Sequence, residues 1–234
     1  GVVPGSVVTI TGEGLAPTLQ GCQTPLSMFG ALPYELAGVS VQFGPDSAPL
    51  NAPMFHVCNV NGVQSVAVQA PFGLTPGLWP ATVRVQGGST RVENVQVFAV
   101  QPGIFETTGA NGLRYGVAVR PDGSYVTPDN PAKRGEIICL FATGLGAVNP
   151  PIGTNVRGLS NQQVVAEVIV GVNHAGTRLE RAEYAPGVIG LYTVYFEIPA
   201  DTATGPAQPL ALAAKGAGDA QFIFGNGSTI AIQP

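Results

Sequence analysis

Few residues in this chain could do chemistry, and the three cysteines come first. Cys22, Cys58 and Cys139 form an odd set, so three different pairings are possible, and so are three unpaired thiols. Cys22 lies in a polar loop flanked by prolines, Cys58 ends a strand-like run in the same half, and Cys139 lies inside an apolar run. We favour a Cys22–Cys58 disulfide and a buried, free Cys139, because buried thiols pack as small hydrophobic groups. Such a bridge indicates an oxidising compartment.

The two histidines do not point to a metal site. His56 alternates with Cys58 along one strand-like run, so the two side chains are expected on one face. Two ligands do not make a structural zinc site. His174 stands in a turn-like stretch of the other half. The sequence therefore predicts no metal.

The carboxylates are scattered along the chain and read as turn or strand-surface residues. Asp122 and Asp129 lie in turn contexts without the ligand spacing of a calcium-binding loop. Glu180 and Glu183 flank an arginine on or near one strand, whereas a glycosidase pair needs two carboxyl groups that converge in a cleft. Motifs of serine hydrolases, zinc proteases, phosphate-binding loops and thiol oxidoreductases are missing. We expect no enzymatic activity and no cofactor.

Trp79 is the one aromatic residue with a separate functional interpretation. It follows a Gly-Leu pair at a turn or strand start. An exposed tryptophan on a β-sandwich can stack on a sugar ring, although most single tryptophans in such modules belong to the core or an interface. Possible sugar stacking through Trp79 is therefore an alternative prediction.

The composition excludes some partners and favours others. The net charge is −4 and only 10% of residues are charged, against about 25% in an average soluble domain. Without a basic stripe or an apolar run of membrane-spanning length, we expect neither nucleic-acid binding nor membrane insertion. Few charges also protect strand edges poorly against pairing. Protein partners or self-association are therefore predicted, and a glycan partner remains an alternative.

The elements that position these residues are predicted to be strands. Glycine and proline number 32 and 21, and the valine-rich runs between them are short. No long window shows a helical apolar face, so short strands and tight turns are expected, with one long loop over residues 12–35. The pattern predicts an all-β fold of β-sandwiches, with about seven strands in each.

The chain also contains an internal repeat. Residues 5–15 (GSVVTITGEGL) correspond to residues 135–145 (GEIICLFATGL), and residues 63–71 correspond to residues 191–199. Two matched blocks in the same order indicate two tandem modules. We place an immunoglobulin-like sandwich at residues 1–100, and a second at residues 101–234 that carries an N-terminal hairpin extension. Residues 101–103 are the predicted linker.

Several of these phrases resemble a known family. Residues 4–12 (PGSVVTITG), 142–148 (ATGLGAV) and 184–192 (YAPGVIGLY) are similar to signatures of the uncharacterised Solibacter-type C-terminal domain, which is built of IPT/TIG-like immunoglobulin folds. The resemblance covers nearly the whole chain and implies a secreted bacterial protein with no assigned activity, cofactor or catalytic residue. Members usually have a further strand-like stretch before the Pro-Gly opener, so the first sandwich is expected to lack or borrow a strand.

Taken together, these patterns predict a non-catalytic extracellular or cell-surface module with a structural, adhesive or assembly role. The chain opens on Gly1 without a methionine or a signal peptide, so we expect a processed fragment. Two alternatives stay open. The first is a subunit of a surface filament joined by strand donation, and the second is a carbohydrate-binding module.

Overall fold

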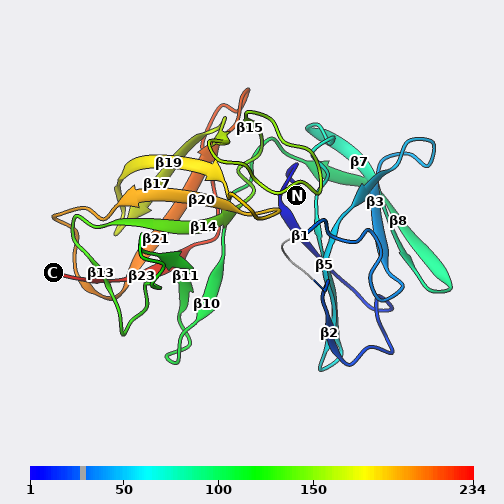
Figure 1. Cartoon of the computed structure of the whole chain (residues 1–234), viewed down its shortest axis with the longest axis horizontal. Helices are drawn as coiled ribbons and strands as arrows, with labels where there is room; N and C mark the ends of the chain where they lie inside the picture. The colour runs from blue at the N-terminus through cyan, green and yellow to red at the C-terminus, as the bar shows by residue number, and fades with distance from the viewer. Residues whose placement is uncertain (27–29) are drawn as a thin grey trace. The chain divides into compact units, whose positions relative to one another are not determined.

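The computed structural model describes residues 1–26 and 30–234, and this part of the chain is all-β without any helix (Figure 1). Its sheets are mostly antiparallel and are consistent with β-sandwich packing. The chain divides into two compact units. Unit 1 contains residues 1–99, 151–160 and 185–190, and unit 2 contains residues 100–150, 161–184 and 191–234.

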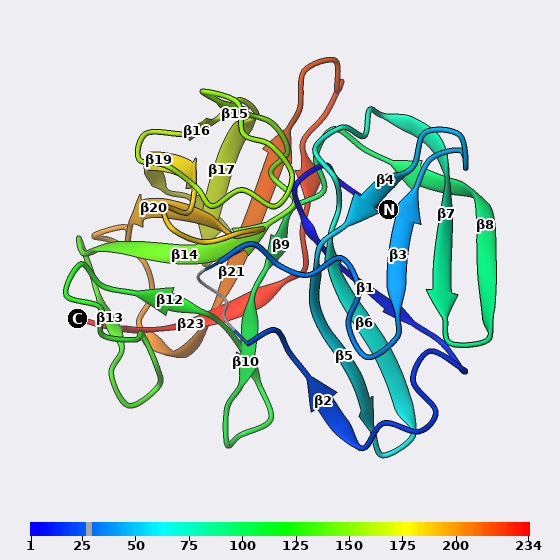
Figure 2. The ribbon, with the colours of Figure 1, turned by 45° about the vertical axis from the view of Figure 1, so that its right-hand side comes forward.

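Unit 1 has two four-stranded sheets, with the orders β1-β6-β5-β2 and β4-β3-β7-β8 (Figure 2). The strands are β1 (Val7–Thr11), β2 (Gly21–Gln23), β3 (Ser40–Phe43), β4 (Leu50–Ala52), β5 (Met54–Val60), β6 (Val63–Gln69), β7 (Gly77–Val85) and β8 (Gly88–Val97). One apolar cluster includes residues of both sheets, such as Val41 and Phe43 of β3 and Val66 and Val68 of β6. Their period of two directs alternate side chains into this core.

Unit 2 has larger sheets. The orders are β10-β11-β23-β21-β17-β18, with β13 beside β23 and β22 beside β21, and β12-β14-β20-β19-β16-β15, with β9 beside β14. The strands up to β15 are β9 (Gly103–Ile104), β10 (Glu106–Thr108), β11 (Arg114–Gly116), β12 (Ala118–Val119), β13 (Ala132–Lys133), β14 (Ile137–Thr143) and β15 (Val148–Asn149). The others are β16 (Gln163–Val164), β17 (Glu167–Val172), β18 (Ala175–Gly176), β19 (Arg178–Tyr184), β20 (Tyr192–Glu197), β21 (Gly205–Lys215), β22 (Ile223–Phe224) and β23 (Ser228–Gln233).

The two units repeat the same strand pairing. The order β1-β6-β5 in unit 1 corresponds to β14-β20-β19 in unit 2, and β4-β3-β7-β8 corresponds to β18-β17-β21-β23. The register matches as well: Val7 faces Gln69 in unit 1, and Ile137 faces Glu197 in unit 2. These pairs join the residues that the sequence repeat aligns, so the repeat is also a repeat of hydrogen-bonded structure.

The backbone at the start of each repeat block follows the same path. The Gly5 N–H donates to the Ala70 carbonyl, as the Gly135 N–H donates to the Ile198 carbonyl. Gly5 and Gly135 have φ values of 79° and 74°, a region that glycine enters without steric cost. Glycine is therefore required at this turn in both units.

Two features of unit 1 differ from the sequence prediction. β2 lies inside residues 12–35, for which the sequence predicts a loop, because its short polar sequence gives no alternation signal. Residues 151–160 and 185–190 fall in the predicted second module but belong to unit 1. Asn155 holds the first of them there, because its side chain accepts from the Leu32 N–H and donates to the Leu32 carbonyl, at 2.7 and 2.9 Å.

Candidate functional site

Cys22 and Cys58 are joined by a disulfide, which is the pairing favoured from the sequence. The two residues face each other across β2 and β5, in register. The bridge links the edge strand β2 to the sheet. We assign the bridge a structural role. It closes the long chain segment between the two cysteines and fixes β2, whose polar side chains could not hold that segment by packing.

Cys139 of β14 is buried and free, also as expected. Burial raises the pKa of its thiol from the ordinary 9.0 to about 11. The Arg181 guanidinium lies 3.5 Å from the ring centroid of Tyr195, the residue that faces Cys139 across β14 and β20. A thiol with so high a pKa is a poor nucleophile near neutral pH, so we assign Cys139 a packing role.

The two histidines belong to different units, His56 to unit 1 and His174 to unit 2. His56 is half-buried on β5, and burial lowers its pKa. His56 and Cys58 lie opposite Ala67 and Ser65 in an unbroken register with β6, so they share a face as predicted, but Cys58 is committed to the disulfide. His174 lies in the turn between β17 and β18 with a φ of 66°. Within residues 1–26 and 30–234, no group of three or more metal-binding side chains is found.

The carboxylates singled out in the sequence take part in turns and ion pairs. Asp122 accepts from the Ser124 N–H at 2.9 Å, and this hydrogen bond lowers the pKa of Asp122. On β19, Glu180 pairs with Arg178, and Glu183 lies 3.4 Å from Arg181. Both glutamates are therefore engaged with neighbouring arginines along one strand.

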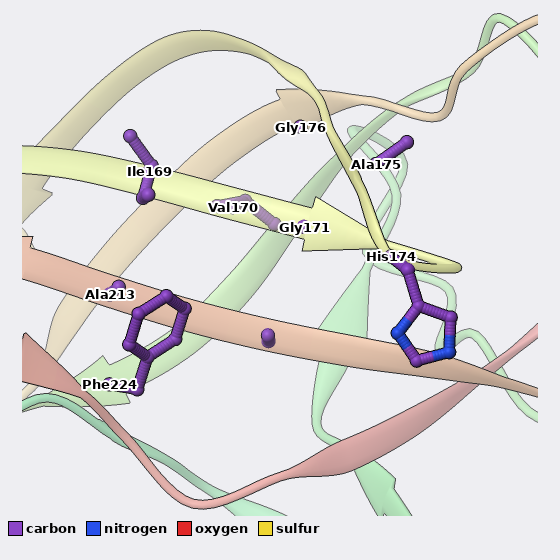
Figure 3. A pocket seen from close by; sticks show the side chains of 9 residues that line it. Ile169, Val170, Gly171, His174, Ala175, Gly176, Ala213 and Phe224 are labelled. Atoms are coloured by element: carbon purple, nitrogen blue, oxygen red, sulfur yellow. The ribbon is translucent and has the colours of Figure 1, made fainter.

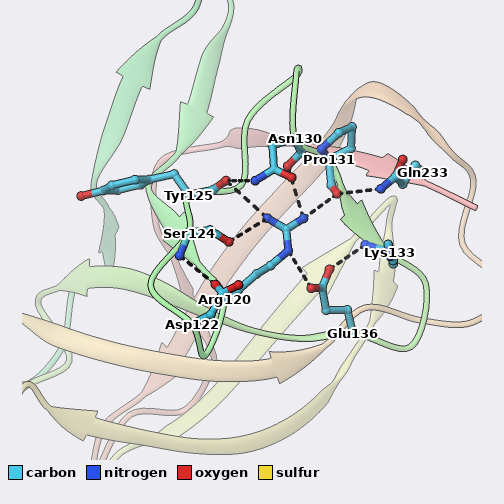
Figure 4. A network of polar contacts seen from close by, with 9 residues as sticks. All are labelled: Arg120, Asp122, Ser124, Tyr125, Asn130, Pro131, Lys133, Glu136 and Gln233. Carbon is cyan, nitrogen blue, oxygen red and sulfur yellow. Dashed lines mark hydrogen bonds and ion pairs between the residues drawn. The ribbon is translucent and has the colours of Figure 1, made fainter.

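Arg120 forms a polar network that the sequence did not reveal (Figure 4). Its Nε lies 2.7 Å from Glu136 Oε1, and its Nη2 donates to the Pro131 carbonyl at 2.6 Å. Glu136 Oε2 accepts from the Lys133 N–H at 2.8 Å. The side chains of Arg120 and Glu136 are only 12% and 21% exposed. This network holds the segment before β14 in place and engages the charges of Arg120 and Glu136 within the fold.

Trp79 lies half-buried on β7 and packs against the core cluster of unit 1. Its indole Nε1–H donates to the Thr75 carbonyl at 2.8 Å. Core packing takes up part of the ring surface that a sugar would need. Sugar stacking by Trp79 stays a prediction, which a glycan array with wild type and Trp79→Ala would test.

Unit 2 has a shallow apolar hollow of about 300 Å³ beside β17, β18 and β21 (Figure 3). Phe224 of β22 and His174 line it at separate places, and Ile169 contributes from β17. Phe224 is 67% exposed and Ile169 is 40% exposed. The hollow lacks converging polar groups of the kind that orient a small ligand.

The larger cavity is in unit 1, a groove of about 850 Å³ along β1, β7 and β8. We call it the seam groove. Its lining includes an aliphatic row on the three strands, formed by Val8, Ile10, Val83, Val85, Val92 and Val95. Glu13 is the only charged side chain among its described lining residues. Five of these aliphatic residues are half-buried, and Val92 is exposed.

In unit 2 the matching positions are covered. Ile138 and Leu140, which correspond to Val8 and Ile10, are 0% exposed. Leu212, which faces Val170 across β21 and β17 as Val83 faces Val41 across β7 and β3, is 1% exposed. The cover is residues 103–133, whose strands β9 and β12 pair with β14 and whose strands β11 and β13 pair with β23.

At Gly116 the covering segment packs closely against the side chains beneath it. A Cβ at Gly116 would lie 2.8 Å from Leu210 and 3.1 Å from Leu140, so the segment lies between side chains of both sheets. In unit 1 only a single parallel bridge, from Val2 to Val97, occupies the corresponding region among the described residues. The sequence predicted an exposed strand edge but not the groove. The apolar and polar residues of β7 alternate in the same way whether the inner face of the strand is covered or open.

β1 is the end strand of its sheet in the described structure. An end strand beside an apolar groove offers main-chain hydrogen bonds and side-chain pockets together, which is what strand addition uses. A scan against protein-family models finds no match to this chain, and a search of curated proteins finds none either. The family resemblance therefore stays a prediction. Across the described residues, no helix is long and apolar enough to span a membrane.

Proposed function

We propose that this chain is a non-catalytic extracellular module of two tandem immunoglobulin-like β-sandwiches, of the IPT/TIG-like kind, with a role in assembly. The repeated strand order of the two units supports the tandem arrangement. The Cys22–Cys58 disulfide supports an extracellular location, since such bridges persist in oxidising compartments. The resemblance to the Solibacter-type C-terminal domain points the same way.

The seam groove is the observation that carries the assembly role. A half-exposed row of aliphatic residues, Val83 and Val85 among them, costs free energy in water unless something covers it. Unit 2 covers the same positions with its own chain. Unit 1 therefore keeps a surface suited to another polypeptide, and the module joins chains through this surface.

Reconstitution with a purified partner tests this function. Proteins captured by the immobilised chain from the surface fraction of a producing bacterium would be identified, purified and titrated against wild type, Ile10→Asp and Val60→Asp. Val60 is 48% exposed at the end of β5, away from the groove lining, and serves as the matched control. We expect Ile10→Asp to weaken binding at least tenfold and Val60→Asp to leave it unchanged. Binding that survives Ile10→Asp would refute an assembly role for the groove.

The groove also supports a second function, a subunit of a surface filament joined by strand donation. A free strand edge beside an apolar groove is what a donated strand requires. Mass photometry and negative-stain microscopy across a wide concentration range would show oligomers or filaments. Monomers at every concentration would exclude this alternative for the chain acting alone.

A further inference from the structure

We propose that the seam groove binds one extended segment of another polypeptide, which adds to the sheet as a strand antiparallel to β1. The segment carries aliphatic side chains at alternate positions and a lysine or arginine at the end that reaches Glu13. This proposal rests on the assembly role above and specifies the chemistry of the partner.

Unit 2 supplies the template for the backbone hydrogen bonds. Phe141 of β14 donates its N–H to the Val117 carbonyl at 3.0 Å and accepts from the Phe105 N–H at 3.1 Å. Thr11 corresponds to Phe141, because Thr11 faces Ser65 in β6 just as Phe141 faces Thr193 in β20. The N–H and carbonyl of Thr11 are therefore the groups that an added strand would meet.

Unit 2 also supplies the template for the side chains. Ile104 faces Ala142 and Ala118 faces Leu140, and both covering side chains are buried, at 6% and 0% exposure. The corresponding acceptor positions in unit 1 are Gly12 and Ile10. An added strand thus places an apolar side chain opposite each of them, and its intervening side chains face solvent.

The charge of the partner follows from Glu13. It is exposed and is the only charged side chain among the described lining residues of the groove. Opposite charges across neighbouring strands stabilise pairing, and like charges weaken it. A basic residue at the start of the added strand is therefore preferred.

A second copy of this chain is a poorer occupant than a different polypeptide. Within the described structure, the segment that covers the matching face is residues 103–119, and strands β9, β11 and β12 already use it inside unit 2. A second copy could donate this segment only by opening its own unit 2. The groove is therefore assigned to a foreign strand.

Fluorescence anisotropy with a synthetic peptide tests the proposal. The probe is Lys-Ile-Thr-Val-Thr-Val-Thr with blocked ends and a labelled Gly-Ser tail, designed to place its isoleucine opposite Gly12 and its first valine opposite Ile10. One control replaces the isoleucine and both valines with serine. A second control carries an N-methyl group on the threonine opposite Thr11, which removes one backbone hydrogen bond without altering the protein. Each control is expected to bind at least tenfold more weakly than the probe.

A charge exchange tests the orientation. Glu13→Lys should weaken binding of the lysine probe roughly two- to fivefold and favour a probe that begins with glutamate by a similar factor. Equal binding of the probe and the serine control, or no effect of N-methylation, would overturn the proposal. Dimerisation of wild type that the probe inhibits would also overturn it, by assigning the groove to a second copy. The probe and its control peptides can bind equally while binding of a purified partner is still lost in Ile10→Asp. In that case the assembly role is kept and strand addition is refuted.

Discussion

Units 1 and 2 share a strand order but close their sheets differently. In unit 2, residues 103–133 pair with the outer edges of β14 and β23 and bury the apolar face between them. In unit 1, the same face of β1 and β8 borders the seam groove. The covering segment of unit 2 therefore decides whether these aliphatic positions form a core or line an open groove.

The largest expected effect comes from truncating one equivalent pair of side chains. Leu140→Ala should lower the free energy of unfolding by roughly 4 kcal/mol, because Leu140 is fully buried and leaves a cavity. Ile10→Ala should cost only about 1–2 kcal/mol, because Ile10 is already half-exposed. Chemical denaturation followed by circular dichroism measures both. Equal losses would mean that the groove is closed in solution.

Two equivalent glycines sharpen the comparison at the backbone. Gly144 and Gly14 have φ values of 75° and 78°, but a Cβ at Gly144 would lie 1.9 Å from the Gln101 carbonyl oxygen, whereas Gly14 has nothing within 4 Å. Gly144→Ala should cost roughly 3 kcal/mol, through both strain and displacement of the covering segment. Gly14→Ala should cost about 1 kcal/mol, through backbone strain alone. Thermal unfolding of the two variants would contradict the comparison if their losses matched.

Loss of the disulfide is expected to destabilise unit 1 and to leave unit 2 unchanged. The Cys22–Cys58 bridge has a sequence separation of 36 residues, and its loss should lower the free energy of unfolding by roughly 2–3 kcal/mol. Cys22→Ser with Cys58→Ser should speed hydrogen exchange in β2 and β5 and leave β14 and β20 unchanged. Hydrogen exchange with mass spectrometry reads both units at once. Unchanged hydrogen exchange in β2 would refute the structural role assigned to this bridge.

Alkaline pH should affect unit 2 through its buried thiol. The pKa of Cys139 is raised from 9.0 to about 11 in the folded chain, so the folded state holds its proton where the unfolded state has lost it. The free energy of unfolding is therefore unaffected by this group below pH 9.0 and falls between pH 9.0 and about 11, by roughly 1–2 kcal/mol. Cys139→Ala should make the fall shallower. Tyr195, which faces Cys139 across β14 and β20 and has a raised pKa of its own, is the same in both proteins, so the difference between their slopes reports on Cys139. The same slope in both proteins would exclude Cys139 as the cause.

Local patterns were enough to predict the all-β class and the repeat, and they favoured the cysteine pairing that the structure shows. Alternation and turn residues report on a strand and its neighbours in sequence, and Cys58 lies in such a strand, β5. The assignment of residues 151–160 to unit 1 was not predictable in this way, because it depends on hydrogen bonds from Asn155 to Leu32, far away in the chain. The seam groove escaped prediction for a related reason. Val83 and Val85 alternate as core residues do, and only the position of a separate segment shows that their inner face is partly open.

The disulfide between Cys22 and Cys58 limits where a further chain can add to this sheet. The sheet β1-β6-β5-β2 of unit 1 ends in β2 on one side and in β1 on the other. β2 is three residues long and covalently fixed, so it offers little length for templating a further chain. Further chains are therefore expected to add at β1 rather than at β2. In this sheet the chain offers one free edge of useful length, which permits a defined joint at β1.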